Sequence, residues 1–153
     1  MNIRTFKTKS EMDEAHQKEV NNFPFVFAFS DEQFRKRIKE KWNLDMDNKD
    51  HLKQIYSIGA GGYILKSDSK AMHEMFDRHL AERKQFTQNF KNLVEVIKYE
   101  MANHEYGYTG DPTDALNALS EHTDNPRFAE AWKKAEKEYL KEYRDCNETE
   151  AAV

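Results

Sequence analysis

The residue types best suited to chemistry lie together in residues 99–112, YEMANHEYGYTGDP. Within this stretch Glu100 and His104 are four residues apart, so on a helix they share one face, as metal ligands often do. Glu105 and Asp111 add two more carboxylates. A small hydrolase or nuclease could use His104 with Glu105 or Asp111 as its acid and base groups, with or without a divalent metal.

The same stretch is also typical of the end of a helix. Gly107 or Gly110 can adopt the positive φ that ends a helix or turns the chain, and the helix dipole favours a histidine at a C-terminal end. The stretch lacks the second histidine of the H-E-x-x-H motif, and no other histidine stands at a recognised ligand spacing. We therefore predict no catalytic residue, metal or cofactor, and keep His104, Glu105 and Asp111 as the candidates for an enzyme.

A contact surface for a partner protein is a further interpretation of this stretch. Tyrosines in such a connection pack their rings over the core and keep their hydroxyl groups in water. Aromatic residues make good interface anchors because they bury much area at small entropic cost. We expect a partner-binding surface built from the loop 104–111, the tip of the predicted hairpin and flanking charged helices. Its residues in the loop are His104, Glu105, Tyr106, Tyr108 and Asp111.

The glycine-rich residues 59–70, GAGGYILKSDSK, raise the question of a phosphate site. Backbone amides of such loops can hold phosphates, and a helix N-terminus favours anions. However, no G-K-[ST] follows the glycines, which join two predicted strands, and Asp68 would repel a phosphate. We predict a hairpin turn followed by a capped helix, with anion binding as the alternative. The candidate anion-binding residues are Lys66, Ser67, Ser69 and Lys70.

Basic segments suggest a nucleic-acid-binding accessory protein as a second alternative. Residues 35–41 (RKRIKEK) and the stripe Lys133, Lys137 and Lys141 could meet a phosphate backbone. Glutamates are interleaved in both segments, which is typical of a solvated helix face. The net charge of −4, from 24 basic and 28 acidic side chains, is too small to make the whole molecule a nucleic-acid binder or a DNA mimic.

The cellular setting follows from what the sequence lacks. Cys146 is the single cysteine, so an intrachain disulfide is excluded and a reducing compartment is favoured. The N-terminus has no apolar signal segment, and no 18-residue apolar stretch occurs in the chain. We expect a cytoplasmic protein outside the membrane, either a monomer or a homodimer.

The segment FPFVFAFS has the period of a strand. Phe25, Phe27 and Phe29 alternate with Val26 and Ala28, so both faces are apolar. Such a strand is either covered on both faces or has a close helix on the Val26 and Ala28 side. We expect the phenylalanines to nucleate a three-stranded sheet that holds the helices in place.

Capping and turn signals predict the remaining elements. Ser10 can cap a short first helix, and Ser30 with Gln33 forms a capping box for a helix from residue 31. Residues 55–58 and 63–66, joined by glycines, predict a β-hairpin, whereas NLDMDNKDH between helix and hairpin reads as a loop.

The second half of the sequence predicts helices. The apolar period over residues 69–103 is too long for one helix, so we expect a break near residues 85–89, where Thr87 could cap the second helix. Further helices begin at Asp111 or Thr113 and at Pro126. The last helix carries a stripe of Phe128, Trp132, Ala135, Tyr139 and Tyr143.

The predicted fold class is α+β, a small three-stranded antiparallel sheet packed by about six helices. At 153 residues, with 38% hydrophobic and 34% charged side chains, the chain suits one domain with a small core. We place this domain at residues 1–146 and expect residues 147–153 to form a disordered tail.

Three blocks together resemble a family of small proteins without assigned function, encoded largely in phages and mobile elements of Gram-positive bacteria. They are FVFAFSDEQF (25–34), IYSIGAGGYILKSDS (55–69) and YEMANHEYGYTGDPTDAL (99–116). The resemblance brings no catalytic residues. It implies an accessory protein of a mobile genetic element in a bacterial cytoplasm. By analogy, we expect a non-enzymatic interaction protein with a protein partner, a candidate inhibitor of a host defence component such as a CRISPR nuclease.

Overall fold

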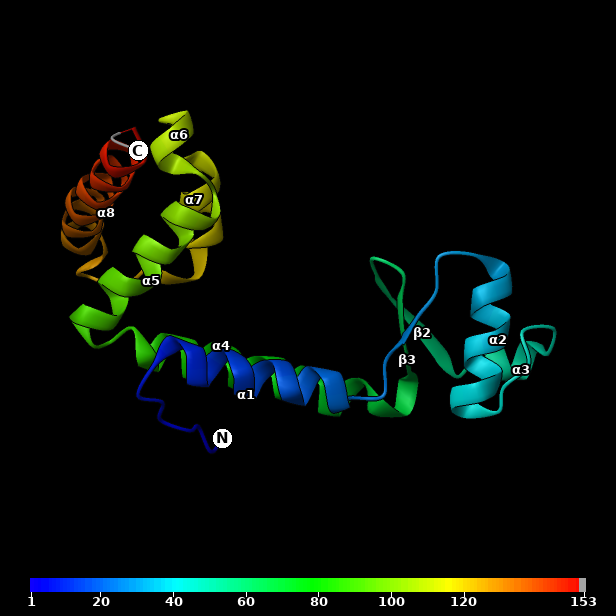
Figure 1. Cartoon of the computed structure of the whole chain (residues 1–153). Helices are drawn as coiled ribbons and strands as arrows, with labels where there is room; N and C mark the ends of the chain where they lie inside the picture. The colour runs from blue at the N-terminus through cyan, green and yellow to red at the C-terminus, as the bar shows by residue number, and fades with distance from the viewer. Residues whose placement is uncertain (152–153) are drawn as a thin grey trace. The chain divides into compact units, whose positions relative to one another are not determined.

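The structure is a computed structural model that describes residues 1–151. Over these residues the chain forms eight α-helices and one three-stranded antiparallel sheet (Figure 1), which confirms the predicted α+β class. The elements are α1 (Lys9–Asn22), β1 (Val26–Phe27), α2 (Asp31–Trp42), α3 (Lys49–Leu52), β2 (Ile55–Gly59), β3 (Gly62–Leu65), the 3-10 turn η1 (Lys66–Asp68), α4 (Ser69–Phe86), α5 (Phe90–Asn103), α6 (Tyr106–Thr109), α7 (Thr113–Ala118), the 3-10 turn η2 (Ser120–His122) and α8 (Phe128–Ala151).

The residues group into two compact units. We call the first, Met1–Glu14 with Leu80–Val153, the helical unit, and the second, Ala15–His79, the sheet unit. The units differ in charge, because 13 basic and 18 acidic side chains belong to the helical unit and 11 basic and 10 acidic ones to the sheet unit. The expectation of one domain over residues 1–146 stays a prediction.

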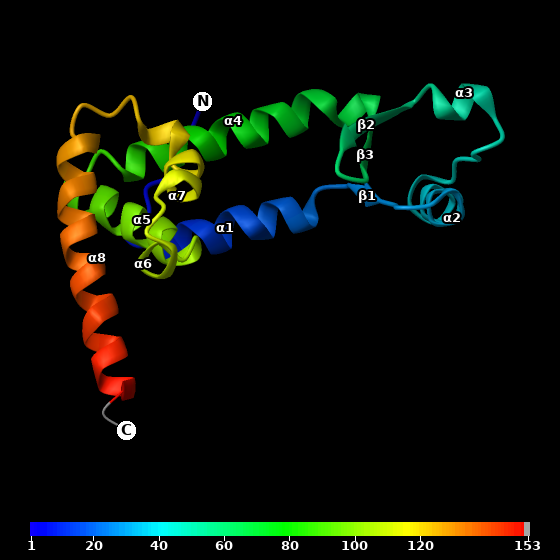
Figure 2. The same ribbon diagram turned by 90° about the horizontal axis from the view of Figure 1, so that it is seen from above.

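The sheet has the strand order β1-β3-β2. The predicted hairpin is confirmed as β2 and β3, which pair antiparallel with Tyr56 opposite Ile64. Figure 2 shows β1 lying beside β3, where Val26 pairs with Tyr63. The predicted capping box is also confirmed, since the backbone N–H of Gln33 donates to Ser30 Oγ at 3.1 Å at the start of α2.

The expectation that Phe25, Phe27 and Phe29 nucleate the sheet is wrong, because two of these three rings are largely exposed. Val26 and Ala28 are buried, whereas Phe27 is 47% and Phe29 77% exposed. Val26 packs with Ile38 of α2, so the close helix on the small-residue side is the correct alternative. Small side chains let α2 approach the strand closely, which leaves the larger rings on the other side. The buried cluster beside this strand in the sheet unit consists of Val26, Ile38 and Leu44, with Phe34, Trp42, Met46, Ile55, Tyr63 and Leu65 packed against it.

Gly61 accommodates one of these exposed rings. It has a positive φ of 76°, and a Cβ at this position would lie 2.5 Å from the ring of Phe29. A glycine is therefore required here by both the backbone conformation and the close ring.

The helical unit is built on α5 packed against α8. The apolar stripe predicted for the last helix lies largely in this core: Ala135 and Tyr139 are buried, and Phe128 and Trp132 pack at its edge. The buried residues of the cluster are Met12, Phe86, Leu93, Val94, Val96, Ile97, Met101, Leu119, Ala131, Ala135 and Tyr139.

Two helix caps differ from those predicted. Thr8, not Ser10, caps α1, because the N–H of Glu11 donates to Thr8 Oγ1 at 3.1 Å. The predicted break between α4 and α5 is confirmed, but Asn89 caps α5 by accepting from the N–H of Asn92 at 3.2 Å. Thr87 is buried and donates its hydroxyl to the Lys84 carbonyl oxygen, so it cannot serve as the cap.

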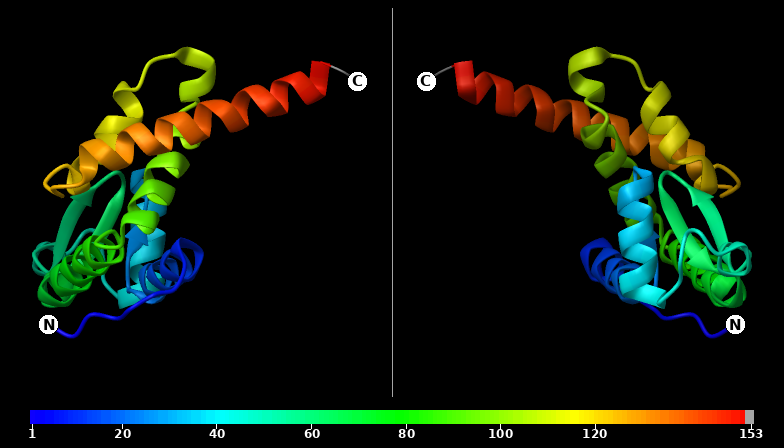
Figure 3. Two further views of the ribbon diagram at one scale, coloured as in Figure 1. Left: turned by 90° about the vertical axis from the view of Figure 1, so that its left-hand side faces the viewer. Right: turned by 90° about the vertical axis from the view of Figure 1, so that its right-hand side faces the viewer.

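The structure also differs from the prediction in two segments that were expected to lack regular structure and at the start of the last helix. Residues 49–52 form α3 within the expected loop because Asn48 caps this turn through the N–H groups of Asp50 and His51. Helix α8 begins at Phe128 rather than at Pro126. It continues to Ala151 past the ends of α5 and α7 (Figure 3), so residues 147–151 are helical instead of a disordered tail. Residues 152–153 of that expected tail lie outside the described residues.

No helix among residues 1–151 combines the length and apolar character needed to cross a bilayer.

The buried imidazole of His122 predicts a dependence of stability on pH. Its Nδ1 lies 3.2 Å from Thr87 Oγ1. Burial lowers the pKa of His122 below its ordinary 6.5, Glu121 opposes this, and Arg83 and Lys84 reinforce it. Because the folded pKa is the lower one, the unfolded state takes up its proton first as pH falls. The contribution of His122 to stability is therefore complete above about pH 6.5, and it declines as pH falls below this value and the unfolded state takes up its proton.

Urea unfolding of wild-type protein and of His122→Gln, measured at pH 7.5 and 5.5, tests this expectation. The wild type should lose more stability between the two pH values than the variant does. Equal losses would show that His122 does not carry the effect.

Candidate functional site

The predicted contact loop, residues 104–111, contains the single helical turn α6, which had been expected as loop. Glu105 precedes this turn with a positive φ of 52°, and Gly110 ends it with a φ of 69°. Of the two glycines expected to turn the chain, Gly110 does so. Tyr108 points outward from the turn and is 81% exposed.

Tyr106, although only two residues away, packs into the helical unit. Its hydroxyl donates to Glu136 Oε2 at 2.8 Å, and its ring centroid lies 6.2 Å from that of Tyr139 and 6.3 Å from that of Trp132. The bond to Glu136 raises the pKa of the Tyr106 hydroxyl, because only the protonated form can donate it. Of this pair of tyrosines, Tyr108 is the one whose ring is exposed to solvent.

The three acid–base candidates have separate contacts. His104 Nε2 lies 3.3 Å from Glu100 Oε2, one turn earlier, as their spacing predicts. Asp111 Oδ1 accepts bonds from the N–H and the hydroxyl of Thr113, which lowers the pKa of Asp111 and starts α7. Glu105 lines the groove described below. The enzyme alternative requires His104 to lie within hydrogen-bond reach of Glu105 or Asp111, and none of these contacts joins His104 to either carboxylate.

The candidate anion site lies where η1 meets α4, after the hairpin as expected. Lys66 Nζ lies 4.8 Å from the ring centroid of Tyr56, and Lys70 Nζ lies 3.8 Å from Glu74 Oε1. Both cations thus have contacts within the sheet unit. Anion binding at Lys66, Ser67, Ser69 and Lys70 stays a prediction.

The basic face proposed for nucleic acid also has internal contacts. On α2, Arg35 donates to Asp47 and Lys39 Nζ lies 3.2 Å from Asp45 Oδ1. Arg37 donates to the carbonyl oxygen of Phe27. These contacts use part of the positive charge that a phosphate backbone would need.

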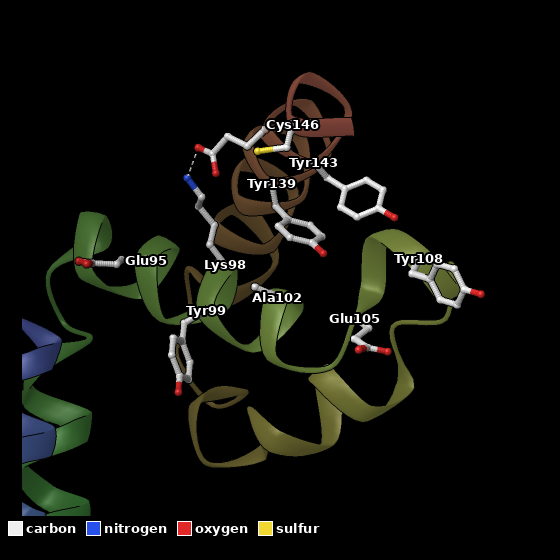
Figure 4. A pocket seen from close by; sticks show the side chains of 10 residues that line it. Glu95, Lys98, Tyr99, Ala102, Glu105, Tyr108, Tyr139, Tyr143 and Cys146 are labelled. Atoms are coloured by element: carbon white, nitrogen blue, oxygen red, sulfur yellow. Dashed lines mark hydrogen bonds and ion pairs between the residues drawn. The ribbon is translucent and has the colours of Figure 1, made fainter. Parts of the chain in front are cut away.

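An open groove of about 820 Å³ lies in the helical unit between α5, α6 and α8 (Figure 4). Its lining residues on α5 recur at i, i+3, i+4 and i+7, and so do those on α8. Each set therefore covers one face of its helix over two turns. We call this feature the tyrosine groove. It is lined by Glu95, Lys98, Tyr99 and Ala102 of α5, by Tyr139, Glu142, Tyr143 and Cys146 of α8, and by Glu105 and Tyr108.

The tyrosines differ in how far they reach into solvent. Tyr139 is buried, and its ring centroid lies 6.2 Å from that of Tyr143 beside it. Tyr99 is 49% exposed and Tyr108 81% exposed. In Figure 4 Tyr139 and Tyr143 extend from α8 toward α6, whereas the ring of Tyr108 points away from the protein. The groove is thus lined by two tyrosines that pack against each other, Tyr139 and Tyr143, and by two solvent-exposed tyrosines, Tyr99 and Tyr108.

The groove is acidic. Glu95, Glu105 and Glu142 line it, with Lys98 as the single cation among its lining residues. Lys98 Nζ lies 2.6 Å from Glu142 Oε1 and 3.5 Å from Glu138 Oε2, and these carboxylates raise its pKa. Lys98 is therefore already paired with the carboxylates of Glu142 and Glu138, and the net charge of the lining residues is negative.

Gly107 brings α6 against α8. Its N–H donates to the Tyr139 hydroxyl at 3.0 Å, and a Cβ here would lie 2.7 Å from the ring of Tyr143. Only glycine allows so close an approach without a shift of the ring.

Gly107→Val is therefore expected to lower the free energy of unfolding by about 2 kcal/mol, because the valine overlaps the Tyr143 ring. Urea unfolding followed by circular dichroism measures the loss. The double variant with Tyr143→Ala should regain part of it, since the obstructing ring is gone. An equal or larger loss in the double variant would contradict this account of Gly107.

Sequence reasoning found Glu105 and Tyr108 but missed the rest of the groove. Tyr99 begins the stretch 99–112 but has no predicted role there, and the sequence places Tyr139 and Tyr143 in the apolar stripe of the last helix. The signal that could have found them is the matching i, i+3, i+4, i+7 spacing of polar and aromatic residues at 95–102 and 139–146.

Within residues 1–151, no cluster of three or more His, Cys, Asp or Glu side chains could hold a metal ion. The chain belongs to a family of unknown function, DUF7659, whose model matches residues 8–138. The matched range includes the α5 lining of the groove together with Glu105 and Tyr108, whereas the α8 lining follows it. Searches of curated proteins and of solved structures found no match to this chain.

Proposed function

We propose that this protein is a non-enzymatic interaction protein, and that the tyrosine groove is the surface that binds its partner protein. The observation that supports the proposal most directly is the exposure of Tyr99 and Tyr108 beside an open groove. Exposed tyrosines around a preformed hollow supply contact area at small entropic cost, which suits an interface.

The alternative of a small hydrolase or nuclease has less support. It requires His104 to work with Glu105 or Asp111. The contacts of His104 with Glu100 and of Asp111 with Thr113 are those of helix ends. A binding function needs no such convergence.

The biological setting of the proposal comes from the sequence blocks that resemble small proteins of phages and mobile elements. We propose that the partner is a host protein of a bacterial defence system, such as a CRISPR nuclease. The identity of the partner is independent of the surface that binds it.

Blocking the groove tests the surface. Ala102 lines the groove and is exposed, so Ala102→Trp should fill the groove without disturbing the core. Ala71→Trp is the matched control, because Ala71 is exposed on α4 in the sheet unit. Tagged wild-type protein and both variants are expressed in the bacterial host and purified with their bound proteins, which mass spectrometry then quantifies.

A partner held by wild type and by Ala71→Trp, but lost from Ala102→Trp, is the expected result. A partner retained equally by all three forms would remove the groove from the proposal. Enrichment of no protein over a tag-only control would remove the interaction function itself.

The defence setting is tested in cells that carry an active CRISPR nuclease and a phage it targets. Expression of the protein is expected to raise the plating efficiency of that phage, and Ala102→Trp should not. Unchanged plating with wild-type protein would rule out inhibition of that nuclease.

A further inference from the structure

We infer that the occupant of the tyrosine groove is a cationic amphipathic helix of the partner protein. The inference rests on the proposed function, since it names the chemistry of the partner at the same surface. Three features of the groove support it: the shape of its walls, its charge and the kind of rings it exposes.

The walls of the groove favour a helix. Both α5 and α8 contribute residues at i, i+3, i+4 and i+7, so the groove is the valley between two helix faces. Seven residues of helix span about 10 Å, because each residue adds about 1.5 Å. An occupying helix of about two turns matches this length and presents its own apolar residues at the same spacing.

The charge of the groove favours a cation-bearing helix. Its lining has three glutamates and one lysine, and that lysine is already held by Glu142 and by Glu138 outside the lining. Helix α5 ends at Asn103, next to the lining residues Ala102 and Glu105, so the negative end of its dipole adds to the same field. The helical unit as a whole has 13 basic and 18 acidic side chains, which favours approach of a basic partner.

The exposed rings favour lysine or arginine beside the apolar residues. Lys9 Nζ lies 3.7 Å from the ring centroid of Tyr99, so this ring already has a cation of the same chain on one face, and Tyr108 is the ring left for a cation of the partner. Tyr108 is 81% exposed beside Glu105, where a cation of the partner can contact both the ring and the carboxylate. A basic amphipathic helix can pack its apolar residues against the tyrosines and pair its cations with the glutamates of the groove.

The experiment uses three helical peptides of about 14 residues, which share one leucine face and differ only in having lysine, glutamine or glutamate on the polar face. Fluorescence anisotropy measures their binding to the full chain. One variant removes the groove carboxylates by Glu95→Gln, Glu105→Gln and Glu142→Gln. The matched control removes three exposed carboxylates of the same unit elsewhere, by Glu14→Gln, Asp114→Asn and Glu130→Gln, so both variants have the same net charge.

The Leu/Lys peptide is expected to bind about tenfold or more tightly than the Leu/Gln peptide, and the Leu/Glu peptide most weakly of the three. The groove variant should lose about tenfold in affinity for the Leu/Lys peptide, whereas the control should change it about twofold or less. Higher salt should reduce the preference for lysine.

Other outcomes separate this inference from the proposed function. Equal binding of the three peptides, lost in Ala102→Trp, would overturn the cationic partner and leave the groove as a binding surface. Equal weakening by the groove and control variants would assign the preference to overall charge and also overturn the inference. Binding of the Leu/Lys peptide that Ala102→Trp leaves unchanged would overturn both the inference and the use of the groove.

Discussion

Arg4→Ala is expected to lower the free energy of unfolding by about 3 kcal/mol, one of the two largest effects that the structure predicts. The side chain of Glu82 on α4 is fully buried. It binds Arg4 of the N-terminal segment, whose own side chain is partly exposed. Arg4 donates to the Glu82 carboxylate oxygens from its backbone N–H at 3.1 Å, from Nε at 2.8 Å and from Nη2 at 3.1 Å. Removing the guanidinium leaves a buried carboxylate with less compensating charge.

Urea unfolding of three variants at pH 7.5 measures this effect. Arg4→Lys keeps the charge but loses the paired geometry of the guanidinium, so its stability should fall between wild type and Arg4→Ala. Arg144→Ala removes an exposed arginine of the same unit and should change stability by about 0.5 kcal/mol or less. A loss for Arg4→Ala as small as that for Arg144→Ala would contradict the structural role of this ion pair.

The double variant Tyr99→Ala with Tyr108→Ala is expected to weaken binding of the Leu/Lys peptide by about 100-fold. Each ring is an exposed aromatic at the groove, and a loss of about tenfold per ring corresponds to about 1.4 kcal/mol for each truncated tyrosine. Both rings lie outside the buried cluster of the core, so the variant should keep its fold. Fluorescence anisotropy measures the affinity, and circular dichroism checks the fold.

Tyr56→Ala is the matched control for this variant. Tyr56 is 47% exposed, close to the value for Tyr99, but it lies in the sheet unit. Its loss should change the affinity by less than about twofold. If the control weakens binding as much as the double variant does, the accessible tyrosines of the groove are not the anchors.

Local signals in the sequence predicted much of the fold because they depend on nearby residues. Ser30 and Gln33 specify a helix start, the glycines at 59–62 specify a hairpin, and the polar run near residue 87 marks a helix break. Each of these three features depends on residues within about four positions along the chain. The α+β class followed from them.

Features that depend on tertiary packing could not be predicted in this way. Phe27 and Phe29 have the larger apolar surface, yet the side chains of Val26 and Ala28 are buried, because α2 packs closely on the small-residue side. The choice between the two faces depends on a helix that the alternation itself does not specify.

The candidate site shows the same limit. Tyr106 and Tyr108 look alike in the sequence, but one bonds Glu136 of α8 and the other faces solvent. Their separation depends on the positive φ at Glu105 and on Gly107, which set α6 against α8. The groove combines residues from 95 to 146, so only the folded chain brings its two helical stripes together.

The most direct measurement of the central claim uses Cys146, the single cysteine of the chain, which lines the groove and is exposed. The rate at which iodoacetamide alkylates Cys146 is measured with and without saturating Leu/Lys peptide. A reference protein combines Cys146→Ser with Asp114→Cys, which places the thiol elsewhere in the same unit. A helix seated in the groove is expected to slow alkylation of Cys146 by about tenfold and to leave the reference thiol unaffected. An unchanged rate at Cys146 while the peptide is bound would show that the partner helix does not occupy the tyrosine groove.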